Sequence, residues 1–220
     1  MERDAVTTVP SRARVALVVA HPDDETLWAG GMLLDHPEWD PFVAALCRRS
    51  DPDRAPRFFR ALERLHAAGA MGDLDDGPDQ APLRAERVQD AVLSLLPQRD
   101  YDLLMTHAPW GEYERHLRHE ETSRAVIALL AEGKLRTRTL WLFAYEDGGR
   151  AYAPRAAAGA PVRFPLPNPV WEEKYGIVRE VYGFGEGSWE ALATPREEAF
   201  WSPSSPEQAM MWAMRGSARP

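Results

Sequence analysis

The sequence is poor in cysteine and in long apolar runs, and each shortage excludes a class of protein. Its single cysteine, Cys47, can form neither an intramolecular disulfide nor a cysteine-rich zinc site. No segment approaches the roughly 20 apolar residues of a membrane-spanning helix. The six-residue apolar run at 15–20 is shorter than a signal-peptide core of about 7 to 15 residues. We therefore expect a cytoplasmic protein that has no membrane partner.

Positive charge is also scarce. The 26 basic residues, two of them lysines, are outnumbered by 34 acidic residues, which gives a net charge of −8 and a pI near 5.3. This balance provides no general attraction for phosphate backbones or anionic lipids, so we expect no nucleic-acid partner. The 220 residues, 45% of them hydrophobic, suffice for one globular core.

Apolar segments that alternate between strand-like and helix-like patterns indicate an α/β fold. Continuous β-branched or bulky runs predict buried strands, and apolar residues spaced three or four apart predict amphipathic helices. The strands are expected at 14–20, 42–47, 101–106 and 139–145, and the helices at 26–34, 56–68, 83–96, 120–131 and 171–182. The alternation favours a single-domain, Rossmann-like three-layer sandwich with a mostly parallel sheet.

Composition also divides the chain into segments. Residues 1–11 mix charge, Thr and Pro without periodicity, and we expect them to form a flexible leader before a domain at 12–201. Residues 146–169 are rich in Gly, Ala and Pro, which predicts a long irregular excursion over the surface. Residues 202–220 predict a C-terminal tail in which 207–214 form a docked helix.

A string of polar residues, His21-Pro-Asp-Asp-Glu25, directly follows the first expected strand. Ligands of open parallel sheets bind beyond the carboxyl ends of the strands, where this string stands. The adjacent carboxylates of Asp23 and Asp24 repel each other unless a cation or water neutralises them, and a metal ion fulfils that need. Capping of the following helix is the alternative role, and it is compatible with metal binding.

A second cluster, His116-Leu-Arg-His119, opens the helix expected after the third strand. Two histidines three positions apart at a helix start can face one point. Together with His21 and one Asp of the first string, one of them can complete a set of two histidines and one carboxylate. Zinc commonly takes three such ligands and keeps a fourth position for water. The HxxH spacing alone is a weak signal, for which an exposed helix start is the alternative interpretation.

The segment 20–25 (AHPDDE), with a strand before it and a helix after it, resembles the signature of the PIG-L/LmbE family of zinc-dependent N-acetylglucosamine deacetylases and related amidases. The order of expected elements from about 12 to 145 is also similar to the core of that family. The resemblance implies an LmbE-like fold. It also implies a hydrolase that removes an N-acyl group, most commonly N-acetyl, from a small sugar-like or amine substrate by means of a zinc-activated water.

The resemblance further implies a role for each residue of the two clusters. The metal ligands are His21, Asp24 and His119, the general base is Asp23, and His116 stabilises the oxyanion or protonates the leaving amine. The family has Pro-Asp where this chain has Leu117-Arg118, so the carboxylate that commonly precedes the third ligand is absent. The cofactor implied is Zn²⁺, although these ligand types also accept another divalent metal such as Fe²⁺.

Three further residues are candidates for substrate binding: Arg57, Asp76 and Trp110. The first two stand at positions similar to substrate contacts in some relatives, and Trp110 is an aromatic residue close in sequence to the proposed ligands. A solvated helix-start arginine and a core-filling tryptophan are the alternative interpretations.

The sequence leaves one alternative function open and disfavours another. A non-catalytic module that keeps the zinc and binds an acylated sugar or amine is the alternative, and the altered HLRH segment is its support. A dinucleotide-dependent oxidoreductase is disfavoured because no GxGxxG follows the first strand. The substrate, its acyl group and the presence of a homo-oligomer stay open.

Overall fold

The computed structural model describes residues 9–215, in which strands and helices alternate around one main sheet. Its seven strands lie in the order β3 (Ala68–Leu74), β2 (Asp40–Cys47), β1 (Arg14–Val19), β4 (Asp100–Thr106), β5 (Arg136–Phe143), β9 (Glu197–Trp201) and β8 (Val162–Pro165). The first five are parallel to one another, and β9 runs antiparallel to both β5 and β8. The predicted α/β fold with a mostly parallel sheet is confirmed.

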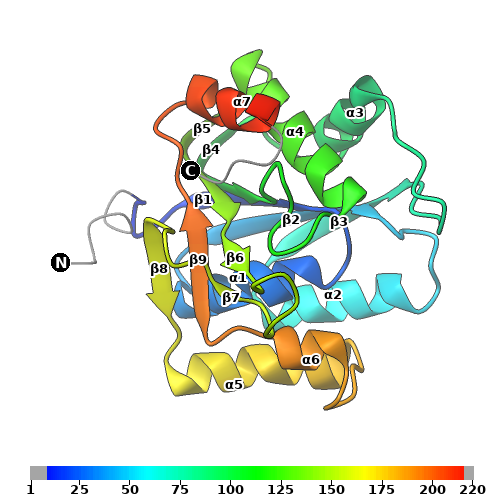
Figure 1. Ribbon diagram of the computed structural model, residues 1–220, viewed down its shortest axis with the longest axis vertical. Helices are drawn as coiled ribbons and strands as arrows, with labels where there is room; N and C mark the ends of the chain where they lie inside the picture. Colours follow the sequence, from blue (N-terminus) through cyan, green and yellow to red (C-terminus); the bar gives the residue numbers. More distant parts are fainter. Residues whose placement is uncertain (1–8, 216–220) are drawn as a thin grey trace.

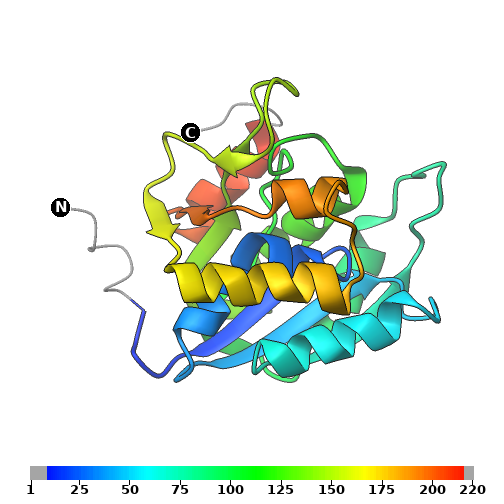
Figure 2. The same cartoon turned by 90° about the horizontal axis from the view of Figure 1, so that it is seen from below.

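Helices cover both faces of the sheet and complete three layers (Figures 1 and 2). One face carries α1 (Asp24–Asp35), α2 (Arg54–Arg64), α5 (Asn168–Gly176) and the π-helical turn η2 (Ile177–Val181). The other face carries α3 (Ala85–Leu95), α4 (Leu117–Ala131) and α7 (Pro206–Arg215). The short helix α6 (Trp189–Ala193) contacts η2. Among the described residues, no helix combines the length and the apolar character needed to cross a bilayer.

The central strands are buried on both faces, as their continuous apolar sequences require. In β1, Val15, Leu17 and Val19 pack toward α1, α2 and η2. Ala16 and Val18 point to the opposite core, beneath α3, α4 and α7. Since β1 lies between β2 and β4, the residues that follow it emerge at the middle of the sheet.

Several elements differ from the sequence-based expectation. The helix expected at 56–68 ends at Arg64, and the chain returns as the edge strand β3. The segment 146–169 is not wholly irregular, because it contains β8 and contributes to a small ribbon of β6 (Tyr145–Glu146) and β7 (Arg155–Ala156).

The expected C-terminal helix is present as α7, which packs on α4. The leader expected at 1–11 falls mostly on residues 1–8, and the end of the expected tail falls on 216–220. Both of these ranges lie outside the described residues.

Candidate metal centre

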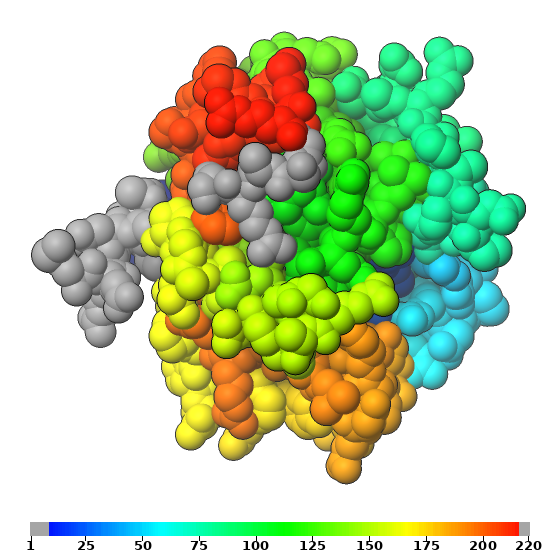
Figure 3. All heavy atoms as spheres, in the orientation of Figure 1, coloured from blue at the N-terminus to red at the C-terminus, as the bar shows by residue number. Residues whose placement is uncertain are grey.

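The two polar clusters meet between β1 and β4, where the order of the sheet reverses. The chain passes from β1 to β2 on one side, whereas β4 pairs with β1 on the other. Open α/β sheets bind ligands at such a switch point. A cavity of about 400 Å³ lies here. Figure 3 shows dark blue atoms of the early chain at the base of a hollow bordered by green and orange segments.

Three candidate ligand atoms form a compact triangle on the wall of this cavity. The Nδ1 atom of His21 lies 3.1 Å from Nε2 of His119. The Oδ2 atom of Asp24 lies 3.3 Å from the first of these nitrogens and 3.4 Å from the second. Atoms that coordinate one zinc ion tetrahedrally at about 2.0–2.1 Å are ~3.4 Å apart. The triangle therefore fits three positions around a zinc-sized ion.

Two other groups of three side chains also bring possible donors within 4.8 Å of one another: His21, His116 and His119, and Asp24, His107 and His119. Both ring nitrogens of His107 already have partners. Its Nε2 accepts the backbone N–H of Ala20 at 2.9 Å, and its Nδ1 lies 2.6 Å from Oε1 of Glu112. These bonds favour a supporting role for His107 over ligation.

Each histidine of the triangle has a carboxylate behind it. Asp76 Oδ1 lies 3.1 Å from Nε2 of His21. Glu112 Oε2 lies 2.7 Å from Nδ1 of His119. Metal-binding imidazoles usually donate their second N–H to such a group, which fixes the tautomer that presents the other nitrogen to the metal. The carboxylates of Asp76 and Glu112 thus orient the two imidazoles so that their other ring nitrogens face the metal position.

The carboxylate of Asp24 is oriented in the same manner. The Nε1–H of Trp28 donates to Oδ1 of Asp24 at 3.2 Å, and the backbone N–H of His21 donates to Oδ2 at 2.9 Å. Asp24 and Trp28 are both buried, which holds this arrangement rigid.

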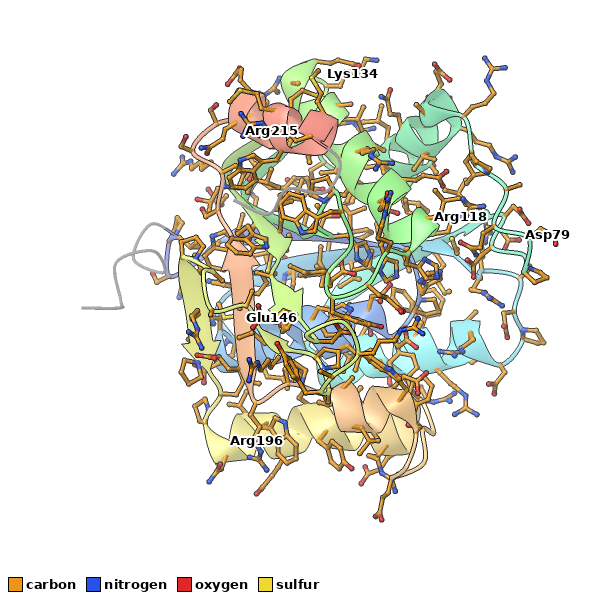
Figure 4. All side chains as sticks on the ribbon, viewed as in Figure 1. Asp79, Arg118, Lys134, Glu146, Arg196 and Arg215 are labelled. Carbon is orange, nitrogen blue, oxygen red and sulfur yellow. The ribbon has the colours of Figure 1, made fainter. Side chains whose placement is uncertain are left out.

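The departure from the family pattern at Arg118 has a structural counterpart. Arg118 is 1% exposed, and its guanidinium donates to the carbonyl oxygens of Asp75 at 2.5 Å and Ala81 at 2.7 Å and to the carboxylate of Glu121. These bonds fasten the start of α4 to the loop after β3, and Figure 4 shows Arg118 beside this loop, which carries Asp79. The same loop presents Asp76 to His21.

The acidic surroundings control the charge of the metal-free triangle. Burial favours neutral His21, but contacts with Asp24 and Asp76 outweigh it and raise the pKa of His21 to about 10. Burial also opposes ionisation of Asp24, yet the nearby His119, His107 and His21 hold the pKa of that carboxyl well below its usual value. The site therefore stabilises positive charge at its centre.

Asp23 lies beside the ligands in an uncommon backbone conformation. Its φ of 120° is in the region that favours glycine, and its backbone N–H donates to Oε2 of Glu25 at 2.9 Å. Arg54 donates to Oδ2 of Asp23 at 2.7 Å. Burial and the charge of Asp24 nevertheless raise the pKa of Asp23 to about 7. A carboxylate that titrates near neutral pH on a cavity wall suits a general base.

His116 forms another part of the cavity wall. Its ring stacks on that of His119 at a centroid distance of 4.4 Å and meets His21 edge-on at 4.9 Å. Burial, together with the charges of His119 and His21, lowers the pKa of His116 to about 4, so the ring is neutral near pH 7 in the metal-free protein. Its Nδ1 has no hydrogen-bond partner within residues 9–215.

Asp76 is the one expected substrate-binding residue that lines this cavity. Its carboxylate contacts His21, and Arg48 donates to Oδ2 from Nε at 2.9 Å. These partners favour orientation of His21 over direct contact with substrate.

Arg57 and Trp110 lie outside the cavity. The guanidinium of Arg57 donates to Asp53 at 2.9 Å and to the carbonyl oxygen of Tyr182, which fastens α2 to the end of η2. Trp110 is 6% exposed and packs against Trp201 and Trp212. The substrate-binding roles predicted for Arg57 and Trp110 therefore have no support in the geometry.

Sequence reasoning missed two residues of the site, Glu112 and Arg54. Both lie in polar loops or at helix starts beside the carboxyl edge of the sheet, and neither belongs to a spacing motif. Glu112 follows β4 and Arg54 follows β2. Since parallel strands end at the same edge of the sheet, these positions alone indicate that both residues lie near the site.

Comparison with known proteins identifies the fold. No protein-family model matches the chain. Uncharacterized protein L374 of Acanthamoeba polyphaga mimivirus is 22% identical in an alignment of 127 residues, which covers 51% of this chain and 56% of that protein. The matched region thus spans little more than half of that relative.

Solved structures match over most of the chain. N,N′-diacetylchitobiose deacetylase from Pyrococcus horikoshii has a TM-score of 0.65 at 16% identity, over 86% of this chain and 84% of its own. The A40926 pseudoaglycone deacetylase Dbv21 has a TM-score of 0.60 at 16% identity, over 86% and 96%. GalB, the 4-carboxy-2-hydroxymuconate hydratase from Pseudomonas putida KT2440, has a TM-score of 0.58 at 17% identity, over 86% and 95%. The chain therefore has the LmbE-like fold that the resemblance implies.

Proposed function

We propose that this chain is a metal-dependent hydrolase that removes an N-acyl group, most simply N-acetyl, from a sugar-like amine. The observation that carries the proposal is the ligand triangle of His21, Asp24 and His119, with Asp23 and His116 on the walls of the same cavity. Deacetylases among the proteins with this fold support it. Zn²⁺ is the proposed metal, and Fe²⁺ is the alternative that the same donors accept.

The chemistry divides between the metal and the protein. When bound, the metal would lower the pKa of a water molecule and polarise the amide carbonyl. Asp23 accepts the proton of the attacking water, for which a pKa near 7 is suitable, and passes it to the amine nitrogen as the C–N bond breaks. Arg54 occupies Oδ2 of Asp23, which leaves Oδ1 for that proton. His116 donates a hydrogen bond to the carbonyl oxygen as negative charge develops there.

Acetate release from N-acetylglucosamine by the zinc-reconstituted protein tests the proposal. We expect Asp23→Asn to bind zinc as the parent chain does and to lose roughly 10²–10⁴-fold in rate, because it removes the proton acceptor and keeps the ligands. Asp79→Asn is the matched control, since Asp79 is an exposed residue of the loop after β3. Full activity of Asp23→Asn would reject the role of Asp23, and a reconstituted protein without bound metal would reject the mechanism.

The same assay separates the alternatives. A non-catalytic module would bind an acylated sugar saturably and release no acetate. The fold also occurs in a hydratase, and addition of water to a carbon–carbon double bond likewise releases no acetate. Steady acetate release is therefore the discriminating observation.

A further inference from the structure

Glu25 is a buried carboxylate that the proposed reaction does not use. It is 0% exposed and does not line the metal cavity. The backbone N–H of Asp23 donates to its Oε2 at 2.9 Å, and the hydroxyls of Tyr182 and Thr26 each donate to its Oε1 at 2.6 Å. Both oxygens of this carboxylate are thus engaged, and one of their partners is the proposed general base.

Asp23 occupies the N-cap of α1 without capping that helix through its side chain. Its carbonyl oxygen accepts the N–H groups of Thr26 and Leu27. An N-cap aspartate ordinarily turns its carboxylate back to accept a backbone N–H of the first helical turn. The carboxylate of Asp23 accepts no such N–H from α1, and it lines the metal cavity instead. In this conformation the backbone N–H of Asp23 points to Glu25.

The backbone conformation of Asp23 needs support from its neighbours. Its φ of 120° is strained for a residue with a side chain, and such a conformation persists only where surrounding interactions hold it. Glu25 holds the backbone N–H of Asp23, and Arg54 holds its carboxylate through Oδ2 at 2.7 Å. The proposed base is therefore fixed at both of its ends.

The segment 177–184 supports both of these contacts. Tyr182 is 4% exposed, and its own N–H closes an i→i−5 hydrogen bond of η2 at 3.1 Å. Such π-helical turns are frequent at functional sites. The hydroxyl of Tyr182 fixes Glu25, and the ring of Phe184 lies 5.1 Å from the guanidinium carbon of Arg54. One segment thus supports Asp23 through its backbone and through its carboxylate.

We infer that Glu25 and Tyr182 are positioning residues that keep the carboxylate of Asp23 turned to the metal cavity. This inference rests on the proposed function for the role of Asp23 as a base. Neither positioning residue lines the cavity. The bonds that orient the ligand Asp24 come from Trp28 and from a backbone N–H. Disturbing the pair should therefore leave zinc affinity intact.

Two substitutions of Glu25 separate positioning from packing. Glu25→Gln keeps an oxygen for the N–H of Asp23, and its NH₂ group can donate to the two hydroxyls, which also accept hydrogen bonds. Glu25→Met has a similar length and supplies no oxygen. With N-acetylglucosamine and the zinc-loaded protein, we expect Glu25→Met to lower kcat roughly 10- to 100-fold at unchanged KM, because a misplaced base affects the chemical step. Glu25→Gln should keep most of the parent kcat.

Tyr182→Phe is a milder variant, which decides the question if Glu25→Met does not fold. Glu25 keeps two of its three donors, so we expect kcat to fall about 3- to 10-fold at unchanged KM and zinc affinity. Tyr101→Phe is the matched control. Tyr101 is also 4% exposed, and its hydroxyl donates to the carbonyl oxygen of Gln98 at the opposite edge of the sheet. The kcat of Tyr101→Phe should equal that of the parent.

Hydrogen exchange of the Asp23 amide, followed by NMR, distinguishes failure of the positioning pair from failure of the hydrolase. If no amide is hydrolysed but this exchange is faster in Glu25→Met and parent-like in Glu25→Gln, the positioning stands without the reaction. If the sugar is hydrolysed and Glu25→Met and Tyr182→Phe keep the parent kcat, the positioning is wrong and the hydrolase stands. Equal losses of kcat in Glu25→Gln and Glu25→Met, or unchanged exchange in Glu25→Met, also overturn it.

Discussion

Replacing Glu112 with Gln exchanges one carboxylate oxygen for an NH₂ group at the point where two histidines meet. In the parent chain, Oε1 of Glu112 lies 2.6 Å from Nδ1 of His107, and Oε2 lies 2.7 Å from Nδ1 of His119. The backbone N–H of Ala20 donates to Nε2 of His107, so neutral His107 carries its proton on Nδ1 and donates to Glu112. The tautomer of His107 is therefore fixed before the substitution is made.

The amide at position 112 then has one acceptor and one donor for two imidazoles. Its oxygen must face His107, because Nδ1 of His107 is a donor. Its NH₂ group faces Nδ1 of His119, which must accept, and the proton of neutral His119 moves to Nε2. Since Nε2 belongs to the ligand triangle, this tautomer competes with the metal. Losing an orienting group costs roughly 10- to 100-fold in metal affinity, or about 1.4 to 2.7 kcal/mol.

Competition with a fluorescent zinc chelator near neutral pH measures this affinity. Glu198→Gln is the matched control, because Glu198 is a fully buried carboxylate that pairs with Lys174 at 2.6 Å and does not line the metal cavity. We expect Glu198→Gln to lower the Tm of the metal-free protein and to leave zinc affinity unchanged. We expect Glu112→Gln to weaken zinc binding while the chain still unfolds cooperatively. Parent-like zinc affinity in Glu112→Gln would refute the tautomer argument.

Two predictions concern the stability of the metal-free protein. Because the pKa of Asp23 is about 7 in the folded chain and about 3.9 in unfolded chains, its stabilising contribution is complete below about pH 4 and is lost as the pH rises through about 7. Asp23→Asn should therefore raise Tm increasingly over this range, and a gain that does not vary with pH would contradict it. Lys174→Met should lower the free energy of unfolding by about 3–5 kcal/mol, because it leaves the buried carboxylate of Glu198 without its cation. Urea denaturation near neutral pH measures this loss. A loss below about 1 kcal/mol would show that the pair is dispensable.

The sequence predicts those strands whose own residues form a continuous apolar run, because such a run needs burial on both faces of a sheet. Strands β1, β2, β4 and β5 lie inside the sheet and carry continuous apolar runs. The edge strand β3 contains two glycines and little bulk, so its pattern does not favour a strand. A Cβ at Gly69 would lie 2.5 Å from the carbonyl oxygen of Val43, which shows that close packing on β2 selects the residue there. β3 therefore forms because it packs closely on β2, and its own sequence pattern does not predict it.

The antiparallel strands β8 and β9 escape prediction for a related reason. They are short and pair across more than 30 residues of intervening chain, which no local pattern reports. The two clusters of candidate ligands, by contrast, stand at strand ends that the sequence predicts, and the resemblance to the PIG-L/LmbE signature names the ligands within them. β1 and β4 are neighbours in a parallel sheet, so the strings that follow them emerge at one edge.

The positions of the orienting carboxylates, Asp76 and Glu112, depend on how two loops fold. The sequence nevertheless indicates that such groups are needed. Each ligating imidazole requires an acceptor for its second N–H, and Arg118 stands where the family pattern supplies an Asp. The guanidinium of Arg118 cannot accept a hydrogen bond, and the acceptor for His119 is Glu112 in the loop after β4. Arg118 instead fastens the loop that brings Asp76 to His21. Arg118 thus supports the orientation of His21 through this loop, and Glu112 supports that of His119.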